Sequence, residues 1–173
     1  MITDLDQWRG LGRLLPPGED EQFVDYFMIG EQEGGLGFLL SRLRDHDLPI
    51  PANAVAEAAV TAEEWGVWVR SEDEFRLLPV DESGGRCVRL AGPSGAVAIP
   101  DEDLVAWPWL ACASCGAGVS RVCRPEPFGP WVPQHYRVEE CWYEPEELWE
   151  ALADLHSCCD DPECRLRWLA ALD

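Results

Sequence analysis

Lysine is absent from this 173-residue chain. All thirteen of its cations are arginines, and they stand against 33 aspartates and glutamates, so the formal net charge is −20. Binding to phosphates is driven by clustered cations, so this balance argues against duplex DNA or an anionic membrane as the target. A long apolar run is also lacking. The longest uncharged run, residues 104–120, is shorter than the ~20 residues of a spanning helix and contains Pro108.

The beginning of the chain lacks the features of a secretory signal peptide. Residues 1–6 are acidic and offer neither a basic start nor an apolar stretch. We therefore expect a cytoplasmic protein. In a reducing compartment, eight cysteines more often indicate metal ligands or buried thiols than a disulfide framework.

Residues 1–66 have the apolar periodicity of helices. We expect one helix that ends before Pro16-Pro17-Gly18, a short second helix that opens at Glu19, a third over 31–45 and a fourth over 53–65. The next region, residues 67–100, changes character. It contains short β-type runs separated by turn-rich segments, which is the pattern of an antiparallel meander. These runs are 67–70, 75–80, 87–90 and 96–99.

The region 101–173 holds seven of the eight cysteines and six of the nine tryptophans. Two helices are expected there, over 145–155 and 162–172. The sequence thus predicts an α+β protein with a helical region, 1–66, and a second region, 67–173, that combines the meander with a cysteine-rich part. Periodicity predicts four buried tryptophans: Trp8, Trp65, Trp149 and Trp168. Two in irregular context are expected to be exposed: Trp131 and Trp142.

The cysteines suggest a structural zinc site. Cys112 and Cys115 form a C-x2-C pair followed by glycine, a turn that aims two thiolates at one point. Cys159 and Cys164 supply a second, more widely spaced pair, and four thiolates complete a tetrahedral zinc site. Cys158 and His156 are alternative third ligands. Buried thiols are the competing interpretation, and a C-x2-C redox motif would require a βαβ setting that the pattern does not offer.

No catalytic signature stands out. The G-x-S-x-G, H-E-x-x-H, P-loop and Rossmann patterns are all absent, so we expect a protein that is not an enzyme. An enzyme that uses the Cys- and His-rich C-terminal part is the alternative from that class. His135 and Cys123 would be its first residues to test.

Several N-terminal motifs resemble a known family. They are Phe23-Val24-Asp25-Tyr26-Phe27, Gly30-Glu31-Gln32-Glu33, Leu36-Gly37-Phe38-Leu39-Leu40, Asp47-Leu48-Pro49-Ile50-Pro51 and Glu63-Glu64-Trp65-Gly66. They cover about a third of the chain and are similar to small helical immunity proteins encoded beside polymorphic toxins in bacteria. The resemblance implies a cytoplasmic protein that binds and occludes a cognate toxin, and it carries over no catalytic residue.

Acidity and resemblance together predict a non-enzymatic protein that neutralises a basic partner. A strongly negative surface speeds association with a positively charged protein. The candidate partner-binding residues are Glu19, Asp20, Glu21, Glu31, Glu33, Glu72, Asp73, Glu74, Asp101, Glu102 and Asp103. Two alternatives stay open. The acidity could serve solubility or salt adaptation, or the chain could be a zinc-stabilised adaptor that imitates nucleic acid and binds a cellular enzyme.

Overall fold

The computed structural model describes residues 4–47, 49–81, 88–92, 95–100, 103–125 and 132–157. The chain divides into two compact units, Met1–Gly84 and Gly85–Asp173. This boundary lies C-terminal to the one after Gly66 that composition suggested. The reason is that the segment after Gly66 packs on the first unit, where a fifth helix contacts the fourth and a short strand pairs with the chain at Ile50.

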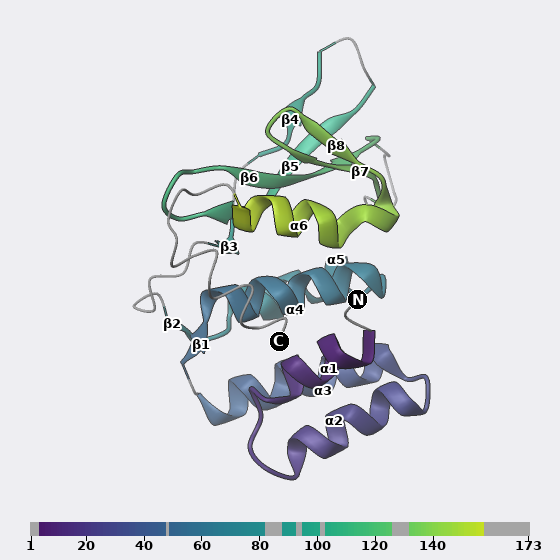
Figure 1. Ribbon diagram of the computed structural model, residues 1–173, viewed down its shortest axis with the longest axis vertical. Helices are drawn as coiled ribbons and strands as arrows, with labels where there is room; N and C mark the ends of the chain where they lie inside the picture. The colour runs from purple at the N-terminus through teal and green to yellow at the C-terminus, as the bar shows by residue number, and fades with distance from the viewer. Residues whose placement is uncertain are drawn as a thin grey trace. The chain divides into compact units, whose positions relative to one another are not determined.

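The first unit contains the four helices that the sequence predicts. They are α1 (Asp4–Gly12), α2 (Glu19–Met28), α3 (Gln32–His46) and α4 (Ala52–Glu64) (Figure 1). The apolar stripes of these helices form the core. Trp8 stacks on Phe23 with 4.4 Å between ring centroids, and its indole N–H donates to the Phe23 carbonyl at 2.8 Å. Leu36, Leu39, Leu40 and Leu43 line α3 on its buried side.

The fifth helix corrects the sequence analysis. The predicted strand over 67–70 and the start of the one over 75–80 are wrong, because α5 (Trp68–Arg76) occupies this stretch. Trp68, Ser71 and Phe75 are its buried residues, at helical spacing. Tertiary packing of that stripe overrides the β-propensity of the valine and tryptophan residues. An ion pair between Glu72 and Arg76, four residues apart, supports the same helix.

A short parallel strand pair closes the first unit. Strand β1 (Ile50–Pro51) pairs with β2 (Val80–Asp81), and Ile50 lies opposite Val80. Parallel strands need a crossover, which α4 and α5 supply between them. The end of the predicted run 75–80 is therefore a strand, but it belongs to this pair rather than to a meander.

The second unit is built on an antiparallel sheet. Its strands are β3 (Val88–Leu90), β4 (Val97–Ala98), β5 (Val105–Cys112), β6 (Gly118–Cys123), β7 (Pro133–Val138) and β8 (Cys141–Tyr143). The sheet order is β3-β5-β6-β7-β8, and β4 also pairs with β5. The predicted runs near 87–90 and 96–99 are thus strands, but both pair with β5. The meander itself runs through β5 to β8, in a region for which the sequence analysis named no strands.

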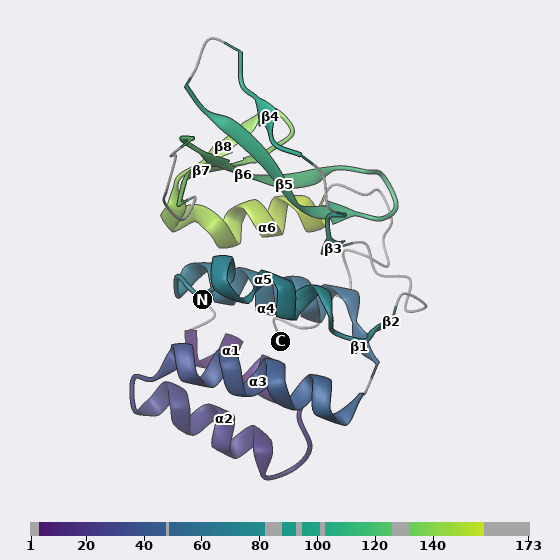
Figure 2. The same ribbon diagram turned by 180° about the vertical axis from the view of Figure 1, so that it is seen from behind.

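One face of this sheet is covered by a helix. After the 3-10 turn η1 (Pro145–Glu147), helix α6 (Leu148–Ser157) lies along β5 to β8 (Figures 1 and 2). The buried residues of α6 include Leu148, Ala151, Leu152 and Leu155. The predicted helix over 145–155 is confirmed, and the one over 162–172 lies outside the described residues. The α+β class is confirmed as well. Across the described ranges, each helix is too short or too polar to cross a membrane.

Candidate binding surface

Glu19 is held inside the α2–α3 hairpin. Its carboxylate accepts a hydrogen bond from Arg42, and its second oxygen lies 2.9 Å from Nε2 of His46. The hydrogen bond from Arg42, followed by the one from His46, lowers the pKa of Glu19 to about 2. Glu19 was predicted to contact a partner. In the structure its carboxylate instead makes contacts within the chain, which join α2 to the end of α3.

The other acids of that cluster line the first turn of α2. A carboxylate oxygen of Asp20 accepts a hydrogen bond from the Gly18 backbone N–H at 2.8 Å. Aspartate side chains commonly make such local bonds to the backbone at the start of a helix. Glu21 is exposed. Both carboxylates lie near the positive end of the helix dipole, which stabilises them there. These two residues also have a local role at the helix start.

Glu31 and Glu33 lie at the other end of the same hairpin. Glu31 is the residue directly before α3 and Glu33 lies in its first turn, whereas Glu19 contacts Arg42 and His46 toward its C-terminal end. At 1.5 Å per residue, the 15-residue helix separates the two ends by about 22 Å. Glu33 also pairs with Arg70 of α5, at 2.6 Å. The two clusters therefore do not form one patch.

The third and fourth predicted clusters are placed only in part. On α5, Glu72 pairs with Arg76 at 2.6 Å, and Asp73 and Glu74 are exposed. Asp103 is exposed in the second unit. Asp101 and Glu102 lie outside the described residues.

Four apolar side chains at the end of α2 and around the junction of α4 with α5 are exposed. They are Met28 (65% exposed), Ile29 (70%), Trp65 (37%) and Val69 (45%). The Trp65 ring meets Phe27 edge-on at 6.3 Å, which links the end of α4 to the end of α2. We call these four residues the apolar corner.

The apolar corner corrects one tryptophan prediction. Trp65 was expected in the core, but it is the residue that follows the end of α4, and 37% of it is exposed. Trp8 is buried and Trp142 exposed, as predicted, and Trp149 is half-buried. Trp131 and Trp168 lie outside the described residues.

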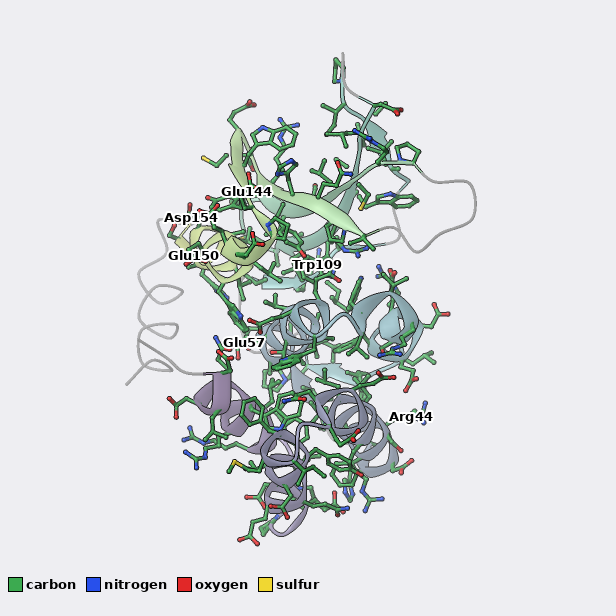
Figure 3. The ribbon with its side chains drawn as sticks, turned by 90° about the vertical axis from the view of Figure 1, so that its right-hand side faces the viewer. Arg44, Glu57, Trp109, Glu144, Glu150 and Asp154 are labelled. Carbon is green, nitrogen blue, oxygen red and sulfur yellow. The ribbon has the colours of Figure 1, made fainter. Side chains whose placement is uncertain are left out.

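An acidic ridge that runs from η1 along α6 is a feature that sequence reasoning missed. Glu146, Glu150 and Asp154 recur every four residues and are all exposed, opposite the buried stripe of α6 (Figure 3 labels Glu150 and Asp154). Asp154 accepts a hydrogen bond from the Tyr143 hydroxyl. The spacing of 146, 150 and 154 was the signal that could have revealed the ridge.

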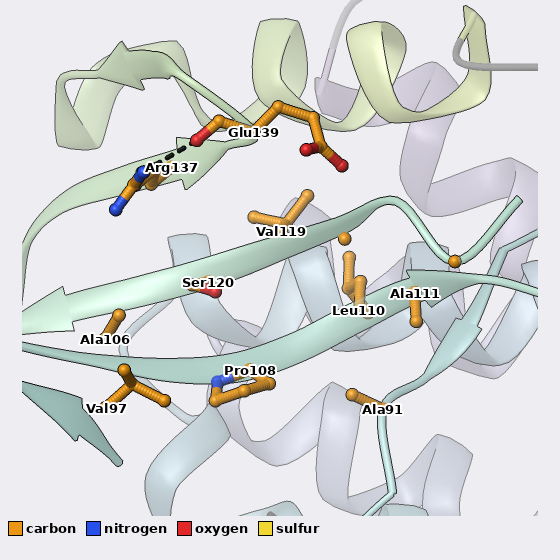
Figure 4. Close-up of a pocket in the computed structure, with 12 residues that line it drawn as sticks. Ala91, Val97, Ala106, Pro108, Leu110, Ala111, Val119, Ser120, Arg137 and Glu139 are labelled. Atoms are coloured by element: carbon orange, nitrogen blue, oxygen red, sulfur yellow. Dashed lines mark hydrogen bonds between the residues drawn. The ribbon is translucent and has the colours of Figure 1, made fainter.

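The sheet face away from α6 carries a cationic–aromatic group. The guanidinium of Arg137 lies 5.7 Å from the ring centroid of Trp142, its cross-strand neighbour. His135 meets the same ring edge-on and lies 3.5 Å from a carboxylate oxygen of Glu144. Next to it is a shallow hollow of about 370 Å³ (Figure 4). Pro108 and Ser120 line the hollow, and Arg137 at its edge donates to the Glu139 carbonyl.

The structure separates the two residues singled out for an enzyme. His135 pairs with Val122 across β7 and β6, so the two share the open face. Cys123 is the next residue of β6 and points to the opposite face, where it is buried. No Cys–His pair forms between them.

The first half of the predicted zinc site is a hairpin turn. Cys112 ends β5 and is buried, and Cys115 is exposed in the turn that leads to β6. The Gly116 N–H donates to the Cys112 carbonyl at 3.0 Å, and Gly116 has a φ of +79°, which favours glycine. Within the described ranges, no three His, Cys, Asp or Glu side chains are grouped to hold a metal. Cys159 and Cys164, and the alternative Cys158, lie outside those ranges.

Sheet register places the end of α6 near this turn. The turn between β5 and β6 shares its end of the sheet with Val138 and Cys141. Strand β8 runs away from that end, and α6 then returns along the sheet to finish at Ser157 (Figures 1 and 2). His156, in the last turn of α6, is buried, and burial lowers its pKa to about 4, so its imidazole is neutral near pH 7.

The comparisons with known proteins add no family to this description. No family model, curated protein or solved structure matches the chain.

Proposed function

We propose that the chain is a non-enzymatic protein that binds and occludes a basic protein, in the manner of a bacterial immunity protein that blocks its cognate toxin. One observation carries the proposal. Five of the thirteen arginines lie within 4.0 Å of a carboxylate of the same chain, so part of the positive charge is engaged inside the protein, and the chain keeps a formal net charge of −20. The arginines concerned are Arg9, Arg42, Arg70, Arg76 and Arg137.

A negative field of this kind acts on the association rate. Its range is about 10 Å at 0.1 M salt, so an approaching basic protein is attracted before contact. Electrostatic steering raises association rates from about 10⁶ to as much as 10⁹ M⁻¹s⁻¹. Occlusion then requires shape and burial rather than a reactive side chain.

The test is co-production with the toxic protein whose gene adjoins that of this chain. We expect growth to be rescued, and the association rate of the purified pair to fall at least about tenfold between 0.05 and 0.5 M salt. Glu31→Gln with Glu33→Gln should lower that rate, and Glu57→Gln, which removes a half-buried carboxylate from the middle of α4, serves as the matched control. Failure to rescue growth, or an association rate indifferent to salt, contradicts the proposal.

We also propose that Cys112, Cys115, Cys159 and Cys164 hold a structural zinc ion. The observation in favour is the pairing of a glycine-closed C-x2-C turn with a helix end that arrives at the same end of the sheet. Thiolates at such a site contribute to folding rather than to catalysis. This centre also suits the second candidate function, a zinc-stabilised adaptor that binds a cellular enzyme by imitating nucleic acid. DNA that competes for the partner would favour the adaptor.

Native mass spectrometry tests the metal directly. We expect one zinc ion per chain, lost in Cys112→Ser and retained in Cys141→Ser, whose thiol is exposed on β8. Chelation should lower the melting temperature of the wild type and of Cys141→Ser. A folded protein without stoichiometric zinc contradicts the site.

A further inference from the structure

The hollow on the open sheet face of the second unit follows from strand register. One residue each from β5, β6, β7 and β8 lies directly opposite the next, so the four form a row on one face: Pro108, Ser120, Arg137 and Trp142. Pro108 and Ser120 are compact, whereas the last two side chains are long. The face is therefore low over β5 and β6, and the hollow of about 370 Å³ lies within the size range of small-molecule sites.

One side of this hollow is apolar. Val97 pairs with Ala106 across β4 and β5, and Pro108 lies two residues further along β5 on the same face. All three line the hollow, and Figure 4 shows them on the side away from Arg137 and Glu139. Val97 is 61% exposed, so apolar surface is in contact with water there. An apolar group of a ligand would remove that surface from water.

Arg137 gives the opposite side a positive charge. Its Nε donates to the Glu139 carbonyl at 2.7 Å, and its guanidinium lies 5.7 Å from the Trp142 ring centroid, so two contacts orient the group. The two terminal nitrogens carry the other donors, in a fork that matches a carboxylate. A carboxylate oxygen of Glu140 lies 3.7 Å from one of them, and the Glu140 side chain is 97% exposed, so this pair is weak. A ligand carboxylate can replace it.

Glu139 lines the same hollow and brings a negative charge to it. Figure 4 shows its carboxylate pointing away from the Arg137 guanidinium, although its carbonyl accepts the Arg137 hydrogen bond. The φ of Glu139 is +53°, in the left-handed region, and the residue belongs to the two-residue turn between β7 and β8. Glycine suits such a turn position better, so the backbone does not account for a glutamate there. Residues held in this way cluster at functional sites.

We infer that this hollow binds a free apolar α-amino acid. Arg137 binds its carboxylate, Glu139 attracts its ammonium group, and its side chain covers the apolar side. Charge complementarity selects this occupant, because a simple anion would face the Glu139 carboxylate and a simple amine would face the Arg137 guanidinium, whereas a zwitterion matches both. The inference concerns the second unit alone and does not rest on the proposed function.

Calorimetric titration of the full chain tests the ligand class. The probes are leucine and phenylalanine, together with three molecules that each lack one group of leucine. Isocaproate lacks the ammonium, isoamylamine lacks the carboxylate, and glycine lacks the apolar side chain. We expect at least one of the two apolar amino acids to bind at one site per chain, and each truncated probe to bind at least about tenfold more weakly. Absence of binding by both amino acids, or isocaproate that binds as tightly as leucine, overturns the inference.

Glu139→Gly separates binding from folding. It removes the carboxylate and gives the turn the residue that its backbone favours, so the melting temperature should stay level or rise while the affinity for the amino acid falls at least about tenfold. Glu140→Gln is the matched control, since it removes a charge from the same turn and should leave binding intact. Arg137→Gln should also lose binding, with circular dichroism to verify its fold. Unchanged affinity in a folded Glu139→Gly or Arg137→Gln overturns the assignment.

Discussion

Gly35 offers a sharp test of the packing in the first unit. It lies on the buried side of α3, and a Cβ placed there would be 2.7 Å from Cζ2 of Trp8 and 2.8 Å from Cβ of Tyr26. Neither neighbour can yield easily. Trp8 is fixed by its stack on Phe23 and its indole hydrogen bond, and the Cβ of Tyr26 is tied to the backbone of α2. Alanine at position 35 must therefore displace a helix or a buried ring.

Two opposing effects set the magnitude for Gly35→Ala. Replacing glycine by alanine inside a helix stabilises it by about 1 kcal/mol, whereas overpacking a dense core costs about 1–3 kcal/mol. Both contacts fall below 3.0 Å, so the upper part of that range applies, and we expect the variant to lose about 1–2 kcal/mol. This corresponds to a fall in melting temperature of very roughly 4–15 °C for a unit of this size.

Gly37 provides the control on the same helix. A Cβ at this position meets nothing within 4 Å, and the residue is exposed. Gly37→Ala should therefore keep the helical gain alone and stabilise the unit by about 0.5–1 kcal/mol. Subtraction of the two variants cancels the intrinsic preference of alanine for the helix. The difference that remains, about 2–3 kcal/mol, is the cost of the contacts with Trp8 and Tyr26.

Urea unfolding followed by circular dichroism measures both free energies of unfolding. An unfolding free energy for Gly35→Ala equal to that of Gly37→Ala would show that α1, α2 and α3 do not pack as described.

Three further predictions concern pH and local contacts. Glu19→Gln should lower the melting temperature at pH 7, and the difference from wild type should vanish as pH falls from about 4.5 to about 2, because a carboxylate with a lowered pKa stabilises only while it is ionised. Ultraviolet titration should show Tyr143 ionising above the ordinary tyrosine range, since its hydrogen bond to Asp154 raises its pKa, and Asp154→Asn should remove that shift. Tyr143→Phe should lower the melting temperature of the second unit only slightly, because the bond is exposed.

The helices of the first unit could be predicted because the spacing of apolar residues and the positions of proline and glycine indicate the same helix boundaries. Leucines recur along α3 at spacings of three and four, and Pro16-Pro17-Gly18 separates α1 from α2. Helix α5 could not be recognised in the same way. Its buried stripe starts with Trp68 beside two valines, and these residue types favour strands when read locally.

The central strands were missed because their patterns are irregular. Strand β5 contains Pro108, and the register shifts between Pro108 and Leu110, so burial does not alternate along it. Strand β7 begins at Pro133, the position where a strand tolerates proline, yet a proline-rich stretch indicates a loop in a sequence. The register shift in β5 is a property of strand pairing, which a single sequence does not reveal.

The sequence shows which residues are acidic, but it does not show which of them lie close together in the folded protein. Glu19 and Glu33 belong to similar runs, yet Glu19 is held between α2 and α3 by Arg42 and His46, whereas Glu33 pairs with Arg70 of α5. The apolar corner was missed because Trp65 ends a periodic helix and was assigned to its buried side. Its position directly before Gly66, where the helix stops, was the available signal.

The arginine–glutamate pairs suggest a physical reason for the absence of lysine. Arginine presents a fork of donors that matches a carboxylate, so it holds an internal pair better than lysine does. Arg42 joins α2 to α3, and Arg70 joins α5 to α3, each through a glutamate. Cations used in this way stabilise the first unit, and the chain as a whole keeps an excess of twenty negative charges. If steering is the purpose of that excess, Arg70→Gln should leave the fold cooperative and raise the association rate with a basic partner, because it removes a positive charge beside the apolar corner. A slower association would instead assign Arg70 a direct contact with the partner.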